Sequence, residues 1–510
     1  MVSSRRCSSL VLTCVLALAL FVPLLAIANS APIGAQSTLS TFPVDPGQSP
    51  FATDPTPVWA IEEANGRYYI GGQFTQVSGR TQAYLAAVNV RTGELDPNFR
   101  PVIAGGATEV KAIALSPNGQ DLYFGGNFRT VDGVTRNRIA KVDAITGQLD
   151  PTFNPNADAA VETIDVDGSG VYVGGRFETI GGTNAPNLAR LLASDGSLNS
   201  NWEGTANGTV LDIELFAGKL YVGGNFSTIS GESHANLVRL NTGRGLVNAR
   251  WNSVGSPERV LSLSLSADGS RVFAGTGGVT TNNGNGNSIW AFDAISGARQ
   301  WQRVIGGDVQ ALETQGDTLF VGTHGDVIYS ENRFLLDGTT LNPNFPVDGY
   351  VEDADNNSNA IERSKLLSLT QNTGALLPFD PHLDSVTGVW ELRTGASGLL
   401  VGGDFTEVLN PNGITGTSSP AATYHVAIFA NPSATEPGFS CTVTTNGNNA
   451  TIRFFGDRGT SLVLRRNGSF AETIADNESR VIIVGGAGDN YTARVRGPQY
   501  ADPFQDISCN

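Results

Sequence analysis

Three observations in the 510-residue chain predict an all-β protein, a seven-bladed β-propeller closed by an N-terminal strand and followed by a small β-sandwich. One glycine-rich string occurs seven times, mostly at intervals of about 50 residues. Each copy is flanked by β-type runs and turn signals. After residue 431 the string is absent, while short runs of alternating apolar and polar residues continue. We expect the propeller over 58–431 and the sandwich over 432–510.

The first 28 residues have the pattern of a signal peptide. Arg5 and Arg6 precede an almost wholly apolar stretch over 10–28, and that stretch ends in small residues at Ala26 and Ala28. Pro23 interrupts the apolar run, and no basic flank follows it, so a permanent anchor is not expected. The sequence therefore predicts export to the cell surface or beyond, with no membrane span after the signal is cleaved.

The charge balance excludes one class of partner. The chain has 32 Lys and Arg against 48 Asp and Glu, which gives a formal net charge of −16. A protein that binds nucleic acid or an anionic membrane needs a basic surface. No nucleic-acid partner is expected.

The repeated string marks one strand of each blade. It runs Tyr69-Ile70-Gly71-Gly72-Gln73-Phe74 in the first unit. Further copies start at Tyr123, Tyr172, Tyr221 and Leu400, and degenerate copies start at Phe273 and Phe320. Two adjacent glycines inside a strand indicate close packing or a bulge rather than a phosphate site.

Three other strands are expected around each copy of the string. An inner strand precedes it, beginning with a valine such as Val58 and carrying a buried aliphatic three residues later, such as Ile61. Asn-Gly and Asp-Gly turns then predict a tight hairpin. A third strand begins sixteen residues after the aromatic, and LDPNF-like strings mark a short outer strand. Four antiparallel strands per unit, repeated seven times, predict a β-propeller.

The N-terminal segment over 29–57 is expected to supply the closing strand. The seventh unit stops after its third strand, at 426–429, without an outer strand of its own. The segment from Leu39 to Asp45 resembles the outer-strand pattern. We therefore expect it to complete the last blade, which would join the two ends of the ring.

An insertion over about 332–363 separates the sixth and seventh units. Part of it is strand-like, so a partial eighth blade is an alternative interpretation. Asp353, Asp355, Asn357 and Asn359 place oxygen ligands at alternate positions, as in a calcium loop, but the turn glycine and the final glutamate of such loops are missing. Calcium is the only cofactor that the sequence indicates, and a solvated loop without a metal ion is the alternative interpretation of this segment.

The C-terminal region reads as a fibronectin-like or immunoglobulin-like sandwich. Cys441 and Cys509 are the two cysteines that remain after signal cleavage, and a lone pair in an exported protein indicates a disulfide. Closing this loop would contribute about 4 kcal/mol through chain entropy.

Two sets of residues are candidates for ligand binding. The residue after the buried aliphatic is acidic in four of seven inner strands, namely Glu62, Asp165, Glu214 and Glu313. Such a ring would attract a cation or a polar sugar, whereas the alternative is a set of solvated side chains beside the turn. Trp59 and Trp390 share a second position and would stack on a sugar, or else pack between blades.

The strings YIGGQF, YFGGNF, YVGGRF and YVGGNF resemble those of bacterial secreted β-propellers built from YVGGxF, or delta-60, repeats, which often end in a fibronectin-type module. The resemblance covers about 58–431. It implies the fold but no activity, because the family has no agreed catalytic residues.

Two function classes follow from these observations. The first is a non-enzymatic surface or extracellular module that binds a glycan or a protein. The second is an extracellular polysaccharide hydrolase or lyase that uses carboxylates on the loop face of the propeller. The absence of nucleophile and phosphate-binding motifs favours the first, and no catalytic residue is assigned.

Overall fold

The computed structural model describes residues 57–253, 257–278, 287–329 and 360–429, the last with breaks at 364, 378, 386, 406, 409–420 and 423–424. It also gives the backbone of strands within 39–45 and 439–506. This part of the chain is all-β and contains no helix of the length and apolarity that a membrane crossing requires.

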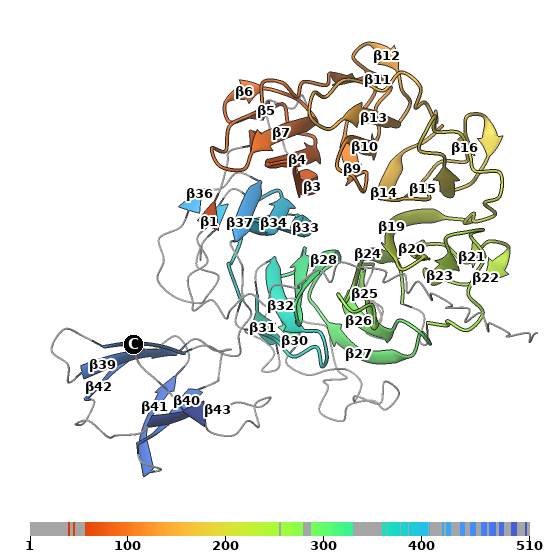
Figure 1. Ribbon diagram of the computed structural model, residues 1–510. Coiled ribbons are helices and arrows are strands. Elements are labelled where there is room, and N and C mark those ends of the chain that lie inside the picture. The colour runs from red at the N-terminus through yellow and green to blue at the C-terminus, as the bar shows by residue number, and fades with distance from the viewer. Residues whose placement is uncertain are drawn as a thin grey trace, which may run out of the picture.

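Seven antiparallel sheets form a β-propeller, as predicted (Figure 1). Each sheet begins with an inner strand: β3 (Val58–Ala64), β9 (Val110–Leu115), β14 (Val161–Asp167), β19 (Thr209–Phe216), β24 (Val260–Leu265), β28 (Val309–Gln315) and β33 (Val389–Gly395). Each inner strand lies beside that of the next blade, and β33 lies beside β3. The seven inner strands therefore form a closed ring.

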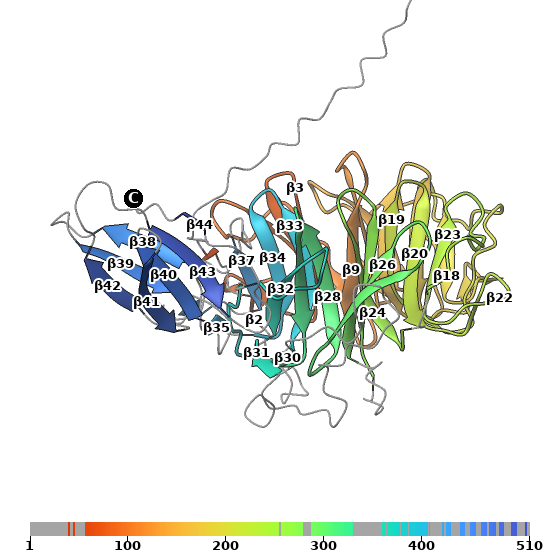
Figure 2. The same ribbon diagram turned by 90° about the horizontal axis from the view of Figure 1, so that it is seen from below.

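The repeated string forms the second strand of every blade. These strands are β4 (Arg67–Gly72), β10 (Asp121–Gly126), β15 (Gly170–Gly175), β20 (Lys219–Asn225), β25 (Arg271–Thr276), β29 (Thr318–Thr323) and β34 (Gly398–Gly403). The third strands are β7 (Leu85–Asn89), β13 (Ile139–Asp143), β18 (Leu188–Leu191), β23 (Leu237–Asn241), β26 (Ser288–Asp293), β32 (Leu366–Thr370) and β37 (Val426–Phe429). Figure 2 shows the blades standing side by side around the ring.

The two glycines of the string have separate roles, and both match the prediction. A Cβ atom on Gly125 would lie 2.6 Å from Val161 Cγ1, so the first glycine allows the next blade to pack closely. Beside the second glycine the register of the inner strand shifts, because Val58 pairs with Gly72 while Ala60 pairs with Gly71. The residue between them, Trp59, is an unpaired bulge residue. The shift recurs in all seven blades.

The outer strand is shorter than the sequence suggests. In five blades the expected strand is reduced to a single bridge on the third strand: Val88 with Leu95, Val142 with Leu149, Leu191 with Leu198, Leu240 with Val247 and Leu369 with Leu376. Blade five alone has a full outer strand from within its own unit, β27 (Arg299–Val304). The aromatic residue of each outer segment still packs on the blade, as where Phe99 meets Tyr69 edge to face at 5.6 Å. Aromatic packing thus holds the segment where ladder hydrogen bonds are few.

The N-terminal segment closes the last blade, as predicted. β1 (Leu39–Ser40) pairs antiparallel with β37, with Leu39 opposite Phe429. The seventh sheet has the order β1-β37-β34-β33, so it combines both ends of the propeller sequence. β2 (Val44–Asp45) then pairs with β5 (Gln76–Val77) of blade one.

Short two-stranded ribbons connect the second and third strands in six blades. β5 pairs with β6 (Arg80–Thr81), and β8 (Ile103–Ala104) joins the ribbon of blade two. The other ribbons are β11 (Thr130–Val131) with β12 (Val134–Thr135), β16 (Thr179–Ile180) with β17 (Thr183–Asn184), β21 (Thr228–Ile229) with β22 (Glu232–Ser233), β30 (Val327–Tyr329) with β31 (Ala360–Glu362), and β35 (Glu407–Val408) with β36 (Ala421–Ala422).

The expected insertion lies inside the ribbon of blade six. Most of it falls outside the described residues, and its last part forms β31, which pairs with β30. The inner strands β28 and β33 lie directly beside each other. No eighth blade therefore stands between blades six and seven in the ring, and that alternative is wrong.

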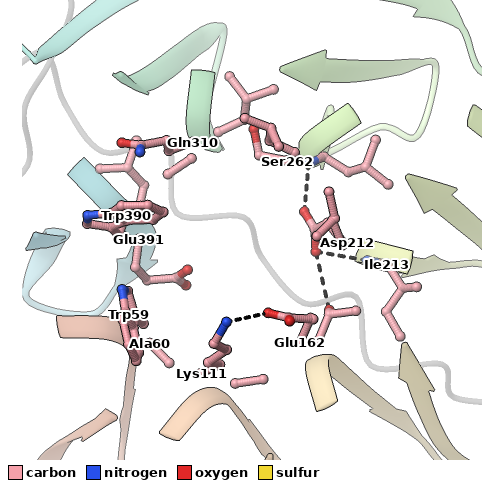
Figure 3. A pocket seen from close by; sticks show the side chains of 18 of the residues that line it. Trp59, Ala60, Lys111, Glu162, Asp212, Ile213, Ser262, Gln310, Trp390 and Glu391 are labelled. Atoms are coloured by element: carbon pink, nitrogen blue, oxygen red, sulfur yellow. Dashed lines mark hydrogen bonds and ion pairs between the residues drawn. The ribbon is translucent and has the colours of Figure 1, made fainter. Parts of the chain in front are cut away.

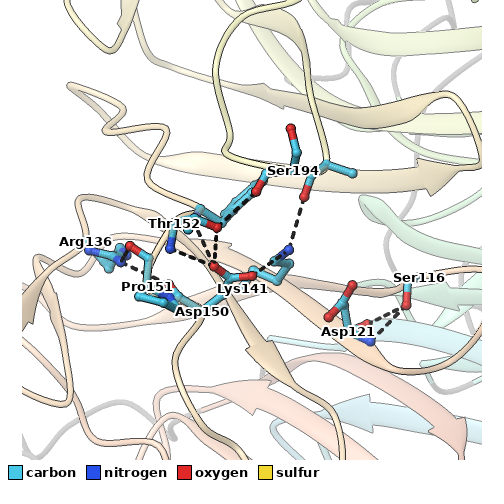
Figure 4. A network of polar contacts seen from close by, with 10 residues as sticks. Ser116, Asp121, Arg136, Lys141, Asp150, Pro151, Thr152 and Ser194 are labelled. Carbon is cyan, nitrogen blue, oxygen red and sulfur yellow. Dashed lines mark hydrogen bonds and ion pairs between the residues drawn. The ribbon is translucent and has the colours of Figure 1, made fainter.

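Polar contacts join neighbouring blades at their outer parts. Lys141 Nζ forms an ion pair with Asp150 at 2.7 Å and donates a hydrogen bond to the Ala193 carbonyl of blade three at 3.1 Å (Figure 4). Thr152 Oγ1 donates to the Ser194 carbonyl at 3.0 Å. These contacts position blade two against blade three.

The C-terminal strands form two antiparallel sheets. One sheet has the order β38 (Phe439–Val443), β39 (Asn449–Phe454) and β42 (Ser479–Ile483). The other has the order β41 (Ser469–Ala475), β40 (Ser461–Arg466), β43 (Tyr491–Arg496) and β44 (Gln505–Asp506).

Candidate functional site: the central cavity

A cavity of about 550 Å³ lies at the centre of the ring, and inner strands from all seven blades line it (Figure 3). This volume is in the range of about 300–1,000 Å³ that holds small organic ligands. The cavity includes residues just before the inner strands and just after the second strands, such as Pro57 and Gln73. It therefore reaches the face of the propeller where these strand ends meet.

The bulge in each inner strand sets part of the cavity wall. In a regular strand, alternate residues face opposite sides, so Trp59 would lie on the same side as the buried Ile61. The bulge breaks this alternation and re-aims the unpaired residue. All seven bulge residues line the cavity: Trp59, Lys111, Glu162, Leu211, Leu261, Gln310 and Trp390.

Trp59 and Trp390 lie on the same wall of the cavity, on adjacent blades one and seven (Figure 3). Both are partly exposed. Trp390 Nε1 donates a hydrogen bond to Thr387 Oγ1 at 3.1 Å, which fixes its ring. Lys111 Nζ lies 5.5 Å from the centroid of the Trp59 ring. The indoles thus form an aromatic wall beside polar groups.

A charged cluster begins beside Trp59 and continues into the neighbouring blades. Lys111 Nζ contacts Glu162 at 2.8 Å, and Arg176 Nε contacts the other oxygen of the same carboxylate at 2.6 Å. Burial opposes the ionisation of Glu162, but these two cations outweigh it and hold the pKa of this carboxyl below its usual range. Glu162 is therefore ionised, and each of its two carboxylate oxygens contacts a cation.

Three of the four predicted acidic residues take part in contacts between blades. Glu62 accepts hydrogen bonds from Arg393 at 3.0 and 2.6 Å. Asp165 accepts from the backbone nitrogen of Leu215 at 2.8 Å. Glu313 accepts from the backbone nitrogen of Thr394 at 2.8 Å. Asp165, Glu214 and Glu313 line the cavity, whereas Glu62 is not among its lining residues. Glu62, Asp165 and Glu313 use hydrogen-bonding capacity on the neighbouring blade.

Glu214 is the fourth predicted residue, and it differs from the others. It lines the cavity and accepts no hydrogen bond from the described residues. Burial, followed by the charges of Asp165, Asp212 and Glu313, raises its pKa well above the usual range. Burial likewise raises the pKa of Asp165 to about 6.

Two further carboxyl groups line the cavity that sequence analysis did not identify. Burial raises the pKa of Asp212 to about 7, although this carboxylate accepts hydrogen bonds from Ile213 and Leu263. Burial and the charges of Asp212, Glu62 and Glu313 raise the pKa of Glu391 well above its usual range. Glu391 accepts no hydrogen bond from the described residues, and its side chain points into the cavity between the two indoles (Figure 3).

Arg393 brings a positive charge that favours the ionised form of these acids. Its guanidinium has a pKa well above its usual range, chiefly because of Glu62 and also because of Glu313, Glu391 and Glu214. Arg393 is thus one cation near several carboxyl groups, more than it can pair with. The cavity therefore combines an aromatic wall with unpaired carboxyl oxygens.

The sequence carried a weak signal for the missed residues. Asp212 and Glu391 share one position of the inner strand, but the other five blades have Ala, Thr or Ser there. Lys111 and Glu162 share the bulge position with the tryptophans. Their common role becomes visible only when the bulge is known.

The remaining predicted sites fall outside the described side chains. Asp353, Asp355, Asn357 and Asn359 all lie in the segment that is not described, and so does Cys509. Cys441 lies in β38, of which only the backbone is described. Within the described residues, no three His, Cys, Asp or Glu side chains are grouped so that they could hold a metal ion.

Comparison with known proteins supports the fold. The family model named "Domain of unknown function (DUF5122) beta-propeller" matches residues 63–99, 121–153, 170–201 and 218–243, in the first four blades. No curated protein matches.

Solved structures that are similar include the WD40 repeats of RRP9, with 12% identity and a TM-score of 0.43, covering 78% of this chain and 99% of that one. The WD40 β-propeller domain of Doa1 has 12% identity and a TM-score of 0.42, covering 72% of this chain and 94% of that one. The computationally designed Ika8 protein has 11% identity and a TM-score of 0.42, covering 77% of this chain and all of that one.

Proposed function

We propose that this protein is a non-enzymatic binding module and that its ligand is a glycan held in the central cavity. The observation that carries the proposal is the position of Trp59 and Trp390 on one cavity wall. An indole face matches the apolar face of a sugar ring, and polar groups around it hydrogen-bond the hydroxyls. Glu391 and Gln310 supply such groups on the same side of the cavity.

The test compares matched substitutions at the bulge position. Trp59→Ala and Trp390→Ala each remove an aromatic face, whereas Leu211→Ala removes an aliphatic side chain from the equivalent position in blade four. On a glycan array and then by calorimetry, we expect each tryptophan variant to lose about tenfold or more in affinity, which is about 1.4 kcal/mol. Leu211→Ala should bind as the unaltered protein does.

Thermal unfolding is measured on all three variants so that loss of fold is separated from loss of binding. If the two tryptophan variants keep their affinity for a glycan that the unaltered protein binds, the site lies elsewhere. If a protein ligand binds and no glycan does, the cavity is a protein-binding site instead.

A second candidate is an extracellular polysaccharide hydrolase or lyase. The specific observation in its favour is the raised pKa of Glu391 in a cavity with aromatic walls, because a general acid must carry its proton near neutral pH. Release of reducing ends or unsaturated sugars from a bound polysaccharide, lost in Glu391→Gln, would establish it. Binding without turnover would leave the module as first proposed.

We also propose that the chain is exported and acts at the cell surface or outside the cell. The support is the signal-peptide pattern over 1–28, and the expected mature N-terminus is Asn29. Sequencing the N-terminus of the protein recovered from culture medium and from cells tests this. An intact Met1 in all fractions would contradict export.

Membership of the secreted YVGGxF propellers, with a fibronectin-type module at the C-terminus, is part of the same proposal. It is supported by the repeated strings and by the division of the C-terminal strands into sheets of three and four. A crystal structure of residues 432–510 within the full chain would test the module and the Cys441–Cys509 disulfide together.

A further inference from the structure

The cavity wall has more carboxyl groups than cationic side chains. Its wall contains seven carboxyl groups and four cationic side chains. Two of the cations, Lys111 and Arg176, both contact Glu162 near the mouth. Arg393 pairs with Glu62. The fourth cation, Arg259, is exposed and precedes its inner strand. Deeper in the cavity, carboxyl groups therefore outnumber the cations that could neutralise them.

Two of these carboxyl groups are open to a ligand. Glu391 and Glu214 accept no hydrogen bond from the described residues. Three other carboxylates accept hydrogen bonds from backbone nitrogens of neighbouring blades, namely Asp165, Asp212 and Glu313. The raised pKa of Glu391 and Glu214 has repulsion from neighbouring acids among its causes. A ligand that brought positive charge would relieve this repulsion.

The aromatic wall is also suited to a cation. Indole faces attract ammonium groups, and Lys111 Nζ already lies 5.5 Å from the Trp59 ring centroid. Glu391 projects between Trp59 and Trp390, so a ligand stacked on an indole would meet a carboxylate at its edge (Figure 3). A ring with an apolar face and a protonated amine satisfies both groups at once.

We propose that the ligand is an amino sugar with free, protonated amines, as in a glucosamine oligomer, with a sugar ring on the indole wall and an amine on Glu391. This rests on the proposed function and names its ligand class. A small inorganic cation would leave the tryptophans without a role, and a lysine-rich peptide would use the carboxylates but not the sugar-sized apolar faces. In this arrangement Glu391 binds the amine and the tryptophans bind the ring.

The experiment uses the mature full-length protein and two probes that differ only at the nitrogen. One is a β-1,4-linked glucosamine oligomer with free amines, and the other is the same oligomer with every amine acetylated. At pH 6.5 we expect the free-amine oligomer to bind about tenfold or more tightly, and Glu391→Gln to remove that preference. Glu94→Gln, which removes an exposed acid away from the cavity, is the matched control and should keep the preference.

A second readout is the proton balance. Arg393, Glu62, Glu313 and Asp212 are the charged groups that act on Glu391. Because an amine favours the ionised carboxylate, binding should release protons, and calorimetry in buffers of different ionisation enthalpy measures them. The Glu391→Gln variant should release fewer protons when the free-amine oligomer binds.

The outcomes separate the two proposals. If both oligomers bind equally well and Trp59→Ala abolishes that binding, the glycan site stands and the amino-sugar assignment is overturned. Binding of neither oligomer would overturn the amino-sugar assignment, and binding of no glycan on the array would overturn the proposed function as well. Tight binding of oligolysine that survives Trp59→Ala and Trp390→Ala would overturn the sugar assignment in favour of a peptide.

Discussion

Asp212 in β19 accepts a hydrogen bond at 2.7 Å from the backbone nitrogen of Leu263 in β24, so a side chain of blade four holds the main chain of blade five. The same relation joins Asp165 to Leu215. Neighbouring inner strands belong to different sheets and share no ladder between them. These carboxylates therefore supply hydrogen bonds that the β-sheets themselves do not make.

The first prediction is that Asp212→Asn destabilises the propeller. Both carboxylate oxygens of Asp212 accept backbone hydrogen bonds, one from Ile213 and one from Leu263, whereas an amide has a single acceptor oxygen. One N–H would be left facing an NH₂ group, at a cost of about 1–3 kcal/mol. Urea unfolding measures this, with Glu94→Gln as the control. Unchanged stability would mean that the bridge contributes nothing.

The second prediction concerns Glu391 and pH. Its folded-state pKa is raised, so the folded protein holds a proton that the unfolded chain releases at lower pH. Stability from this group is therefore present in acid and is lost as pH rises through the folded pKa. Asp165 and Asp212 act in the same direction, with pKa values of about 6 and about 7. We expect the melting temperature to fall between pH 5 and pH 8.

Glu391→Gln should weaken this fall, since the amide keeps the shape of the side chain and carries no charge. At pH 8 we expect it to raise the melting temperature by about 2 °C, and at pH 5 to have almost no effect. Melting curves from pH 4 to pH 9 test both statements. A variant that melts lower than the parent at pH 8 would show that Glu391 has a stabilising partner. If Glu391→Gln raises the melting temperature and also removes the preference for free amines, Glu391 is a residue kept for function at a cost in stability.

The third prediction is that Arg393→Met is more harmful at pH 8 than at pH 5. Arg393 Nη2 lies 2.6 Å from Glu62 Oε1 and joins blade seven to blade one. Without it, Glu62, Glu313 and Glu391 would repel one another with no cation between them. We expect a loss of about 1–2 kcal/mol at pH 8, because the pair is partly exposed and thus partly screened. The double variant with Glu62→Gln should recover part of the loss, and strict additivity would contradict a direct coupling.

How far the sequence predicts this site depends on strand alternation. The positions of the repeated strings predict seven blades. The segment Leu39 to Asp45 is predicted to close the last blade, and the pairing of Leu39 with Phe429 confirms this. Glu62, Asp165, Glu214 and Glu313 share one position of the inner strand, and all but Glu62 line the cavity. The sequence leaves two roles open for Trp59, because strand alternation alone does not show the bulge that makes Trp59 an unpaired residue on the cavity wall. The sequence predicts longer outer strands than the structure has. Aromatic residues such as Phe99 keep these segments on the blade by side-chain packing, which does not require a ladder of backbone hydrogen bonds.

The fourth prediction tests the first glycine of the string. A Cβ atom on Gly125 would lie 2.6 Å from Val161 Cγ1 and 3.0 Å from Ile164 Cδ1 of the next blade. Overpacking of this kind costs about 1–3 kcal/mol. Gly125→Ala should therefore destabilise the ring, and Gly168→Ala, where nothing lies within 4 Å, should not. The double variant Gly125→Ala with Val161→Ala should lose less stability than the two single variants combined, whereas strict additivity would mean that the clash is not the cause.

The fifth prediction concerns the closing strand. β1 pairs with β37 through Leu39 and Ser40, and β2 pairs with β5, so these two strands join the N-terminal segment to blade seven and to blade one. A protein lacking these residues would expose the edge of β37 and separate two blades that β1 and β2 bridge. We expect a lower melting temperature and a stronger tendency to associate through the free edge, measured by calorimetry and light scattering.

A synthetic peptide of residues 34–50 provides the control for this deletion. Because strand addition needs only backbone pairing and a matching register, the peptide should bind the shortened protein and restore its melting temperature. A peptide in which Leu39 is replaced by proline removes a backbone donor and should restore less. If the shortened protein melts like the full chain, the ring closes through the β3 and β33 contact and the Arg393–Glu62 pair alone.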